Sequence, residues 1–118
     1  MRYALLIYGD ENAREAAGAD QREAMYQEYD KFGAWLAEKG WMRGGEELDS
    51  TKTATTVRVR DGETLSTDGP FTETKEQLGG YFLIECDDLD QAIEAAARIP
   101  GASFGSIEVR PLVKQPAH

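Results

Sequence analysis

The residues best suited to chemistry lie in one stretch, TDGPFTETKEQLGGYFLIE, which covers residues 67–85. Within it, Asp68 is followed by Gly69 and Pro70. An aspartate in a turn usually accepts a hydrogen bond from the backbone amide two residues further on, but proline has no N–H to donate. The Asp68 carboxylate is therefore predicted to bond elsewhere, to face water or to hold a ligand. The alternative is a tight structural turn in which the Phe71 amide donates to Asp68.

Other titratable side chains could complete an acid/base site around Asp68. Two carboxylates with separated pKa values can transfer a proton without a cofactor, and Glu46 or Glu73 is the candidate partner of Asp68. Tyr29 is the candidate for orienting a small polar or aromatic substrate. A solvated loop is the competing explanation for Glu73 and its charged neighbours. The candidate binding residues follow Asp68 directly and are Gly69, Pro70 and Phe71.

Several other kinds of site are not expected. The one histidine, His118, ends the chain, and the one cysteine, Cys86, lies in the apolar run YFLIEC, which predicts a buried thiol. Ser-His or Cys-His catalysis within one chain is therefore excluded. The sequence contains neither phosphate-binding glycine pattern, GxxxxGK[ST] or GxGxxG, and no spacing typical of metal ligands. We expect neither a metal nor a cofactor.

Charge and hydropathy limit the partners. The 118 residues include 22 acidic and 13 basic side chains, a net charge of -9, and no basic stripe offsets the repulsion of a phosphate backbone. Direct nucleic-acid binding is therefore not expected. The apolar run at residues 3–8 is too short for a signal peptide or a membrane span, so we expect no membrane contact and a cytoplasmic protein. The length predicts one domain over residues 1–112, followed by a flexible tail over 113–118.

Periodicity predicts the elements that must position these residues. A long helix from about Asp20 to Lys39 is expected, with Asp20 and Glu23 as its capping pair. A second helix is expected over 87–100, with an apolar stripe made of Leu89, Ala92, Ile93 and Ala96. Residues 9–19 are expected to form a polar loop. The predicted strands lie at 2–8, 41–48, 80–86 and 105–110, and a hairpin with an Asp61-Gly62 turn lies at 54–67.

This order predicts an α+β fold of the ferredoxin-like βαββαβ plan with an inserted β-hairpin. Right-handed crossovers place both helices on one face of the sheet. The strands at 2–8 and 80–86 are also apolar on the other face. Leaving about four such side chains in water would forfeit roughly 6–12 kcal/mol, which rivals the stability of a whole domain. A homodimer packed sheet against sheet is therefore predicted.

Four segments together resemble a known family: VRVRDGETLSTDGPFTETKEQLGGYFLIE, the start MRYALLIYGDE, GGEEL and the ending GSIEVRP. They are similar to DGPF-domain proteins of the YCII-related superfamily over nearly the whole chain. The resemblance implies a bacterial protein with a dimeric α/β barrel and a cleft near the strand ends and dimer interface. It also implies genes that lie beside extracytoplasmic-function sigma factors.

Enzymatic members of that superfamily, including one that eliminates chloride from a chlorinated aromatic compound, are thought to use a His-Asp pair with the histidine on the first long helix. This sequence has no histidine there, and Tyr29 stands roughly in its place. A tyrosine with an ordinary pKa of about 10 is a poor base at neutral pH, so that mechanism is not expected here.

Two functions remain open from the sequence. One is a cofactor-independent enzyme that acts on a small polar or aromatic molecule through carboxylate acid/base chemistry at Asp68. The other is a non-catalytic small-ligand-binding or regulatory module associated with a sigma-factor-related protein.

Overall fold

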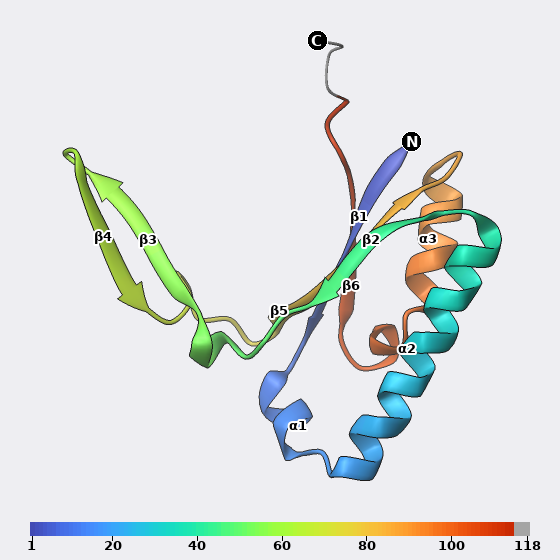
Figure 1. Cartoon of the computed structure of the whole chain (residues 1–118), viewed down its shortest axis with the longest axis horizontal. Coiled ribbons are helices and arrows are strands. Elements are labelled where there is room, and N and C mark those ends of the chain that lie inside the picture. The colour runs from blue at the N-terminus through green and yellow to red at the C-terminus, as the bar shows by residue number, and fades with distance from the viewer. Residues whose placement is uncertain (115–118) are drawn as a thin grey trace.

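The computed structural model describes residues 1–114. Four strands form an antiparallel sheet in the order β2-β5-β1-β6, and two more form a separate hairpin (Figure 1). The strands are β1 (Arg2–Gly9), β2 (Met42–Glu47), β3 (Thr55–Arg60), β4 (Glu63–Asp68), β5 (Gln77–Glu85) and β6 (Ser106–Pro111). The helices are α1 (Glu11–Ala16), α2 (Ala19–Lys39) and α3 (Leu89–Arg98), with 3₁₀ turns η1 (Thr51–Thr53) and η2 (Pro100–Ser103).

The mixed α+β class is confirmed, as is the order strand, helix, strand, hairpin, strand, helix, strand. The hairpin prediction is also confirmed, because Asp61 and Gly62 both have positive φ, 52° and 79°, as a type I′ turn requires. Of the predicted flexible tail at 113–118, residues 115–118, including His118, lie outside the described residues.

Two predictions about helix starts are wrong. Residues 9–19 are not all loop, because the Asp10 side chain accepts from the amides of Asn12 and Ala13 and so starts helix α1. The long helix α2 is not capped by Asp20 and Glu23. It starts one residue earlier, where the amide of the extended Gly18 donates to the Gln21 side chain at 3.3 Å.

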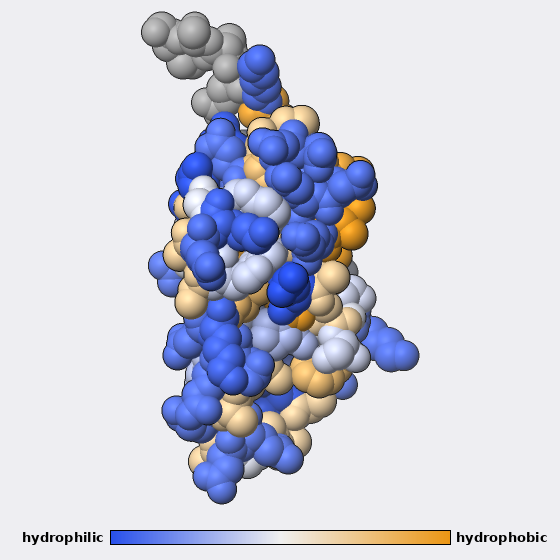
Figure 2. Space-filling model, turned by 90° about the vertical axis from the view of Figure 1, so that its right-hand side faces the viewer, coloured by the Kyte–Doolittle hydropathy of each residue, from blue (hydrophilic) through white to orange (hydrophobic). Residues whose placement is uncertain are grey.

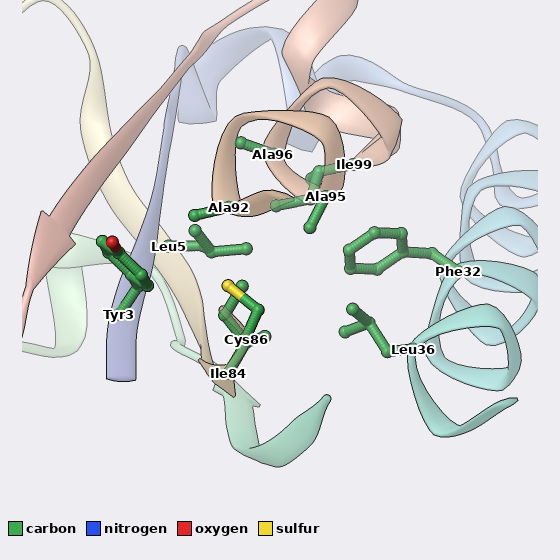
Figure 3. Packing of buried hydrophobic residues seen from close by; sticks show 10 residues of the cluster. All are labelled: Tyr3, Leu5, Phe32, Leu36, Ile84, Cys86, Ala92, Ala95, Ala96 and Ile99. Carbon is green, nitrogen blue, oxygen red and sulfur yellow. The ribbon is translucent and has the colours of Figure 1, made fainter. Parts of the chain in front are cut away.

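The core fills the space between α2, α3 and one face of the sheet (Figure 3). Its buried members are Tyr3, Leu5, Phe32, Leu36, Ile84, Cys86, Ala92, Ala95, Ala96 and Ile99. The predicted stripe of α3 is wrong in part, because Leu89 and Ile93 are half-exposed while Ala95 is buried. The three alanines have no side chain beyond Cβ, which lets α3 lie close to the sheet. Cys86 is buried, as predicted.

The other face of the sheet carries no helix (Figure 1). Tyr3, Leu5 and Phe82 point to the helical side, and side chains alternate along a strand. Leu6 and Tyr81, which pair with each other across β1 and β5, therefore point to the opposite side. We call this opposite side the open face; its apolar side chains are Ala4, Leu6, Tyr8, Tyr81 and Leu83. All five are only partly buried.

The outer side of the helices has a different character. Figure 2 looks on to that side of the molecule, and hydrophilic residues cover most of it. The helical side is therefore typical of a surface that faces water, whereas the open face combines apolar side chains with partial exposure.

The hairpin of β3 and β4, residues 55–68, is called the arm below. It projects from the sheet on the side away from α2 and α3 (Figure 1). The radius of gyration is 16.4 Å, whereas a compact domain of this length has about 13.5 Å. The arm therefore stands out as an extension and is not folded back on the body.

Candidate functional site

The candidate site lies at the base of the arm, where β4 ends at Asp68. Gly69 has a φ of 94°, which only glycine adopts without strain, and its amide donates to the Ala54 carbonyl at 2.7 Å. The Thr56 hydroxyl donates to the Gly69 carbonyl at 2.8 Å. These two bonds join the beginning and end of the arm, so the backbone around Asp68 is held in place.

The Asp68 side chain is exposed and pairs across the ribbon with Thr55. Within residues 1–114, its carboxylate accepts no hydrogen bond, and the turn in which Phe71 donates to it is not formed. Gly69 lies half-buried, and both Pro70 and Phe71 are exposed, Phe71 with 74% of its surface accessible. A charged acceptor is thus followed three residues later by a large exposed aromatic ring.

The segment after Phe71 returns to the sheet through polar contacts. The Thr74 hydroxyl donates to the Glu76 carbonyl at 2.5 Å, and the Gln77 side chain donates to the Thr74 carbonyl at 2.5 Å. Ser106 on β6 donates to the Glu76 carboxylate at 2.9 Å. Glu76 is therefore used in structure, while Glu73 is exposed and accepts no hydrogen bond from the described part of the chain.

Tyr29 lies on the helical side of the sheet. Its ring stacks on Phe82 with the ring centroids 6.4 Å apart. Burial raises the pKa of Tyr29, and a backbone hydrogen bond at Gly101 works in the opposite direction. A phenol whose pKa is raised further stays protonated at neutral pH, so Tyr29 can donate or accept a hydrogen bond but is not a base.

Glu46 lies on the open face, because it pairs with Tyr81 across β2 and β5. Tyr29 and Glu46 are thus on opposite sides of the sheet, and one chain does not bring them together. No bond in the described residues joins Asp68 to Glu46 or to Glu73. Within the described residues, the single chain therefore presents a carboxylate without a hydrogen-bond partner three residues before an exposed aromatic ring, and the catalytic roles of these residues remain predictions.

Two depressions of the surface lie elsewhere. One, of about 290 Å³, lies between α2 and the end of α3, and the other, of about 380 Å³, lies near the N-terminus. The first is lined by Glu28, Lys31, Phe32, Trp35, Arg98 and Pro100. The second is lined by Met1, Arg2, Glu85, Leu112, Val113 and Lys114. Neither includes a predicted site residue.

Sequence reasoning missed a buried carboxylate that holds the turn at Ser50 and Thr51, just before the arm; we call this turn the root of the arm. Glu11 on α1 is only 8% exposed. It accepts from the Thr51 amide at 3.0 Å, from the Thr51 hydroxyl, and from the Ser50 hydroxyl at 3.5 Å. Its own amide donates to the Gln77 side chain at 3.0 Å. These bonds tie α1, the turn before the arm and the start of β5 into one unit. In the sequence, the acidic pair Asp10-Glu11 was the only feature that could have indicated this role for Glu11.

Two absences concern the described residues alone. Within residues 1–114, no three His, Cys, Asp or Glu side chains come together as metal ligands. No helix in the same range has the length and apolar character needed to span a membrane.

The fold and the arm base define a small α+β protein with a one-sided antiparallel sheet and a candidate polar site on an inserted hairpin. The sequence model of the YCII-related domain matches residues 1–115. An uncharacterized protein of Rhizobium meliloti (strain 1021) is 40% identical over 114 residues, which cover 95% of this chain and 92% of that protein. The chain therefore belongs to the YCII-related family, as the resemblance in its sequence indicates.

Proposed function

We propose that this protein is a homodimer that binds a small polar or aromatic molecule at the base of the arm and acts on it by carboxylate acid/base chemistry. The observation that supports this most is the exposed Asp68 carboxylate, which accepts no hydrogen bond from the described residues and is followed three residues later by the 74% exposed Phe71. An aromatic ring can stack on an apolar substrate while the carboxylate takes or gives a proton.

The open face supports the dimer. Leu6, Tyr8, Tyr81 and Leu83 are only partly buried in the single chain, and burying an apolar side chain fully is worth about 1.5–3 kcal/mol. Because no more than about a third of each remains exposed, a second copy would add at most roughly 2–4 kcal/mol per subunit. The proposed assembly is a ferredoxin-like dimeric α/β barrel in which the two open faces pack together.

Dimer formation also bears on the chemistry. Glu46 lies on the open face, where a second copy would take its carboxylate partly out of water. In this proposal Asp68 forms a carboxylate pair with Glu46 or Glu73 that transfers a proton without a cofactor. Tyr29 lies on the other side of the sheet, so in this proposal it stabilises the core and does not contact the substrate of its own subunit.

Asp68→Asn tests the proposal because it keeps the size of the side chain and removes its charge. The wild-type protein and the variant are screened against a panel of small aromatic and polar acids by thermal shift and one-dimensional NMR. A compound that raises the melting temperature of the wild-type protein and is converted by it, but is not converted by Asp68→Asn, is the expected result. Equal conversion by both proteins contradicts a role for Asp68.

A second function is favoured by the same geometry. Since the single chain forms no carboxylate pair in its described part, a non-catalytic ligand-binding or regulatory module associated with an extracytoplasmic-function sigma factor is the alternative. Its expected signature is ligand-induced stabilisation without conversion, or capture of a purified sigma factor by the immobilised protein. A converted compound together with failed capture excludes this alternative.

A further inference from the structure

The arm has no support within its own chain. Among the described residues, β3 and β4 make extensive contacts only with each other, and every arm residue except Thr56 is exposed. A two-stranded hairpin alone in water is marginally stable at best. An arm of this length that is nevertheless well formed points to a surface that it packs against.

The two sides of the arm differ in chemistry. Directly paired residues share a side of the ribbon. Val57 and Val59, each 59% exposed, pair with Ser66 and Thr64, which makes this side uncharged over its length up to Asp68. The opposite side carries Arg58, Arg60, Glu63 and Leu65. A strand pair with one uncharged and one charged side is typical of an element that buries the first side.

The position of the arm indicates which molecule it packs against. The arm projects on the same side of the sheet as the open face (Figure 1). Any molecule that covers the open face therefore lies next to the arm. The proposed homodimer places a second copy of this chain there, and the inference below rests on that dimer.

The surface area available for burial also favours a second copy of this chain. Four strands of six to nine residues present a face of roughly 400–500 Å², while a stable interface needs about 800 Å² from each partner. One side of the arm adds about 200 Å². In a two-fold dimer each subunit both contributes an arm and receives one, which adds about 400 Å² and brings the total to the required size.

We propose that the arm is an intersubunit arm: the Val57 and Val59 side of β3 and β4 packs on the partner subunit, and the candidate site is complete only in the dimer. The Gly69–Ala54 bond joins the two ends of the arm, and the Glu11–Thr51 bonds fix the turn before the arm to helix α1 of its own subunit. Docking of the arm therefore sets Asp68 and Phe71 against the partner's open face. Each of the two sites combines the arm base of one chain with the sheet of the other.

A double substitution on the uncharged side of the arm and a single control substitution on the opposite side test this. Val57→Asp with Val59→Asp introduces charge on the uncharged side, and Leu65→Asp, at a residue 46% exposed on the opposite side, is the control. Sedimentation velocity over a dilution series gives the dissociation constant. The double variant is expected to raise it about 100-fold or more, while Leu65→Asp is expected to leave it within about threefold. A double variant that associates as tightly as the wild type overturns the proposal.

Hydrogen exchange provides an independent measurement that does not depend on those variants folding well. The wild-type dimer is compared with Leu6→Asp/Leu83→Asp, which places charges on the open face. Amides of β3 and β4 are expected to be protected in the wild type and to exchange at least tenfold faster in this variant, because an undocked hairpin opens readily. Amides of α3 serve as the control for folding. Equal exchange of the arm in both proteins overturns the proposal.

These outcomes distinguish failure of the intersubunit-arm proposal from failure of the dimer proposal. A wild-type dimer that is insensitive to Val57→Asp/Val59→Asp overturns the intersubunit arm and leaves the sheet-to-sheet dimer standing. A wild-type protein that sediments as a monomer at all concentrations overturns both.

Discussion

Replacing Glu11 with alanine should destabilise the protein through the root of the arm. Glu11 is 8% exposed and accepts hydrogen bonds from the Thr51 amide, the Thr51 hydroxyl and the Ser50 hydroxyl. Alanine removes every one of these acceptor contacts. The bonds join α1 to the turn that leads into β3, so their loss should loosen the attachment of the arm as well as lower the free energy of unfolding.

The magnitude follows from the two Thr51 donors. A hydrogen bond to a charged group contributes about 1.5–3 kcal/mol, and the Ser50 contact at 3.5 Å is too long to add much. Water can replace part of the loss because Thr51 is only half-buried. A net loss of about 2–3 kcal/mol is expected for Glu11→Ala, and about half of that for Glu11→Gln, which keeps one acceptor oxygen. In a chain of this length, 2–3 kcal/mol corresponds to a melting temperature lower by about 8–12 °C.

Urea denaturation at one fixed protein concentration measures these differences, since a dimer makes the apparent stability depend on concentration. Glu15→Gln is the matched control on the same helix, because the Glu15 carboxylate bonds Lys52 at 2.8 Å on the exposed surface. Surface ion pairs contribute little, so the control should be close to the wild type. If Glu11→Ala unfolds at the same urea concentration as Glu15→Gln, the assignment of Glu11 as the anchor of the arm is wrong.

Three further predictions concern single residues. Gly105→Ala should lower the free energy of unfolding by about 3 kcal/mol or more, because an added Cβ would lie 2.1 Å from the Tyr8 carbonyl oxygen, whereas Gly9→Ala, with no atom within 4 Å, should be tolerated; equal urea midpoints would contradict the observed packing. Burial raises the pKa of the Cys86 thiol, so Ellman's reagent should react slowly with the native protein near pH 8 and rapidly in guanidinium, and fast native reaction would show an accessible thiolate. The hydrogen bond from Lys52 lowers the pKa of Glu15. A lowered carboxyl pKa stabilises the fold above the unfolded value, and this contribution is lost as the pH falls through the folded value. The difference in stability between wild type and Lys52→Gln should therefore be small, because the pair is exposed, present at pH 7, and absent well below pH 4.5; a difference that persists at pH 2 would show another cause.

The elements with strong periodicity were predictable from the sequence. The spacing of Phe32 and Leu36 marks the buried side of α2, and Asp61-Gly62 marks the turn of the arm. Helix starts that depend on short-range side-chain contacts were harder to predict from the sequence. The start of α1 depends on the Asp10 carboxylate reaching two amides, and that of α2 on Gln21 reaching back to Gly18. Several residues in these stretches could cap a helix equally well in sequence, and packing selects among them.

The sequence located the segment around Asp68, but not how its residues lie relative to Glu46 and Tyr29. Proline at position 70 left two interpretations of Asp68 open, a carboxylate without a local partner and a turn bonded to the Phe71 amide. The described residues show no bond from the Phe71 amide to Asp68. The relation of Asp68 to Glu46 and Tyr29 depends on which side of the sheet each residue occupies. A bulge at Arg43, between Met42 and Gly44, shifts the register of β2 by one residue, and one step of register moves a side chain to the other face. The position of Glu46 was therefore set by a feature whose length the sequence does not specify.

The mass of the protein in solution tests the central claim most directly. Sedimentation velocity or light scattering at micromolar concentration should give twice the chain mass of 13.1 kDa, and Leu6→Asp/Leu83→Asp should give the mass of one chain with the same helical content by circular dichroism. A wild-type protein that has the mass of a single chain at this concentration would contradict the account, because the open face and the arm would then both lie uncovered in water.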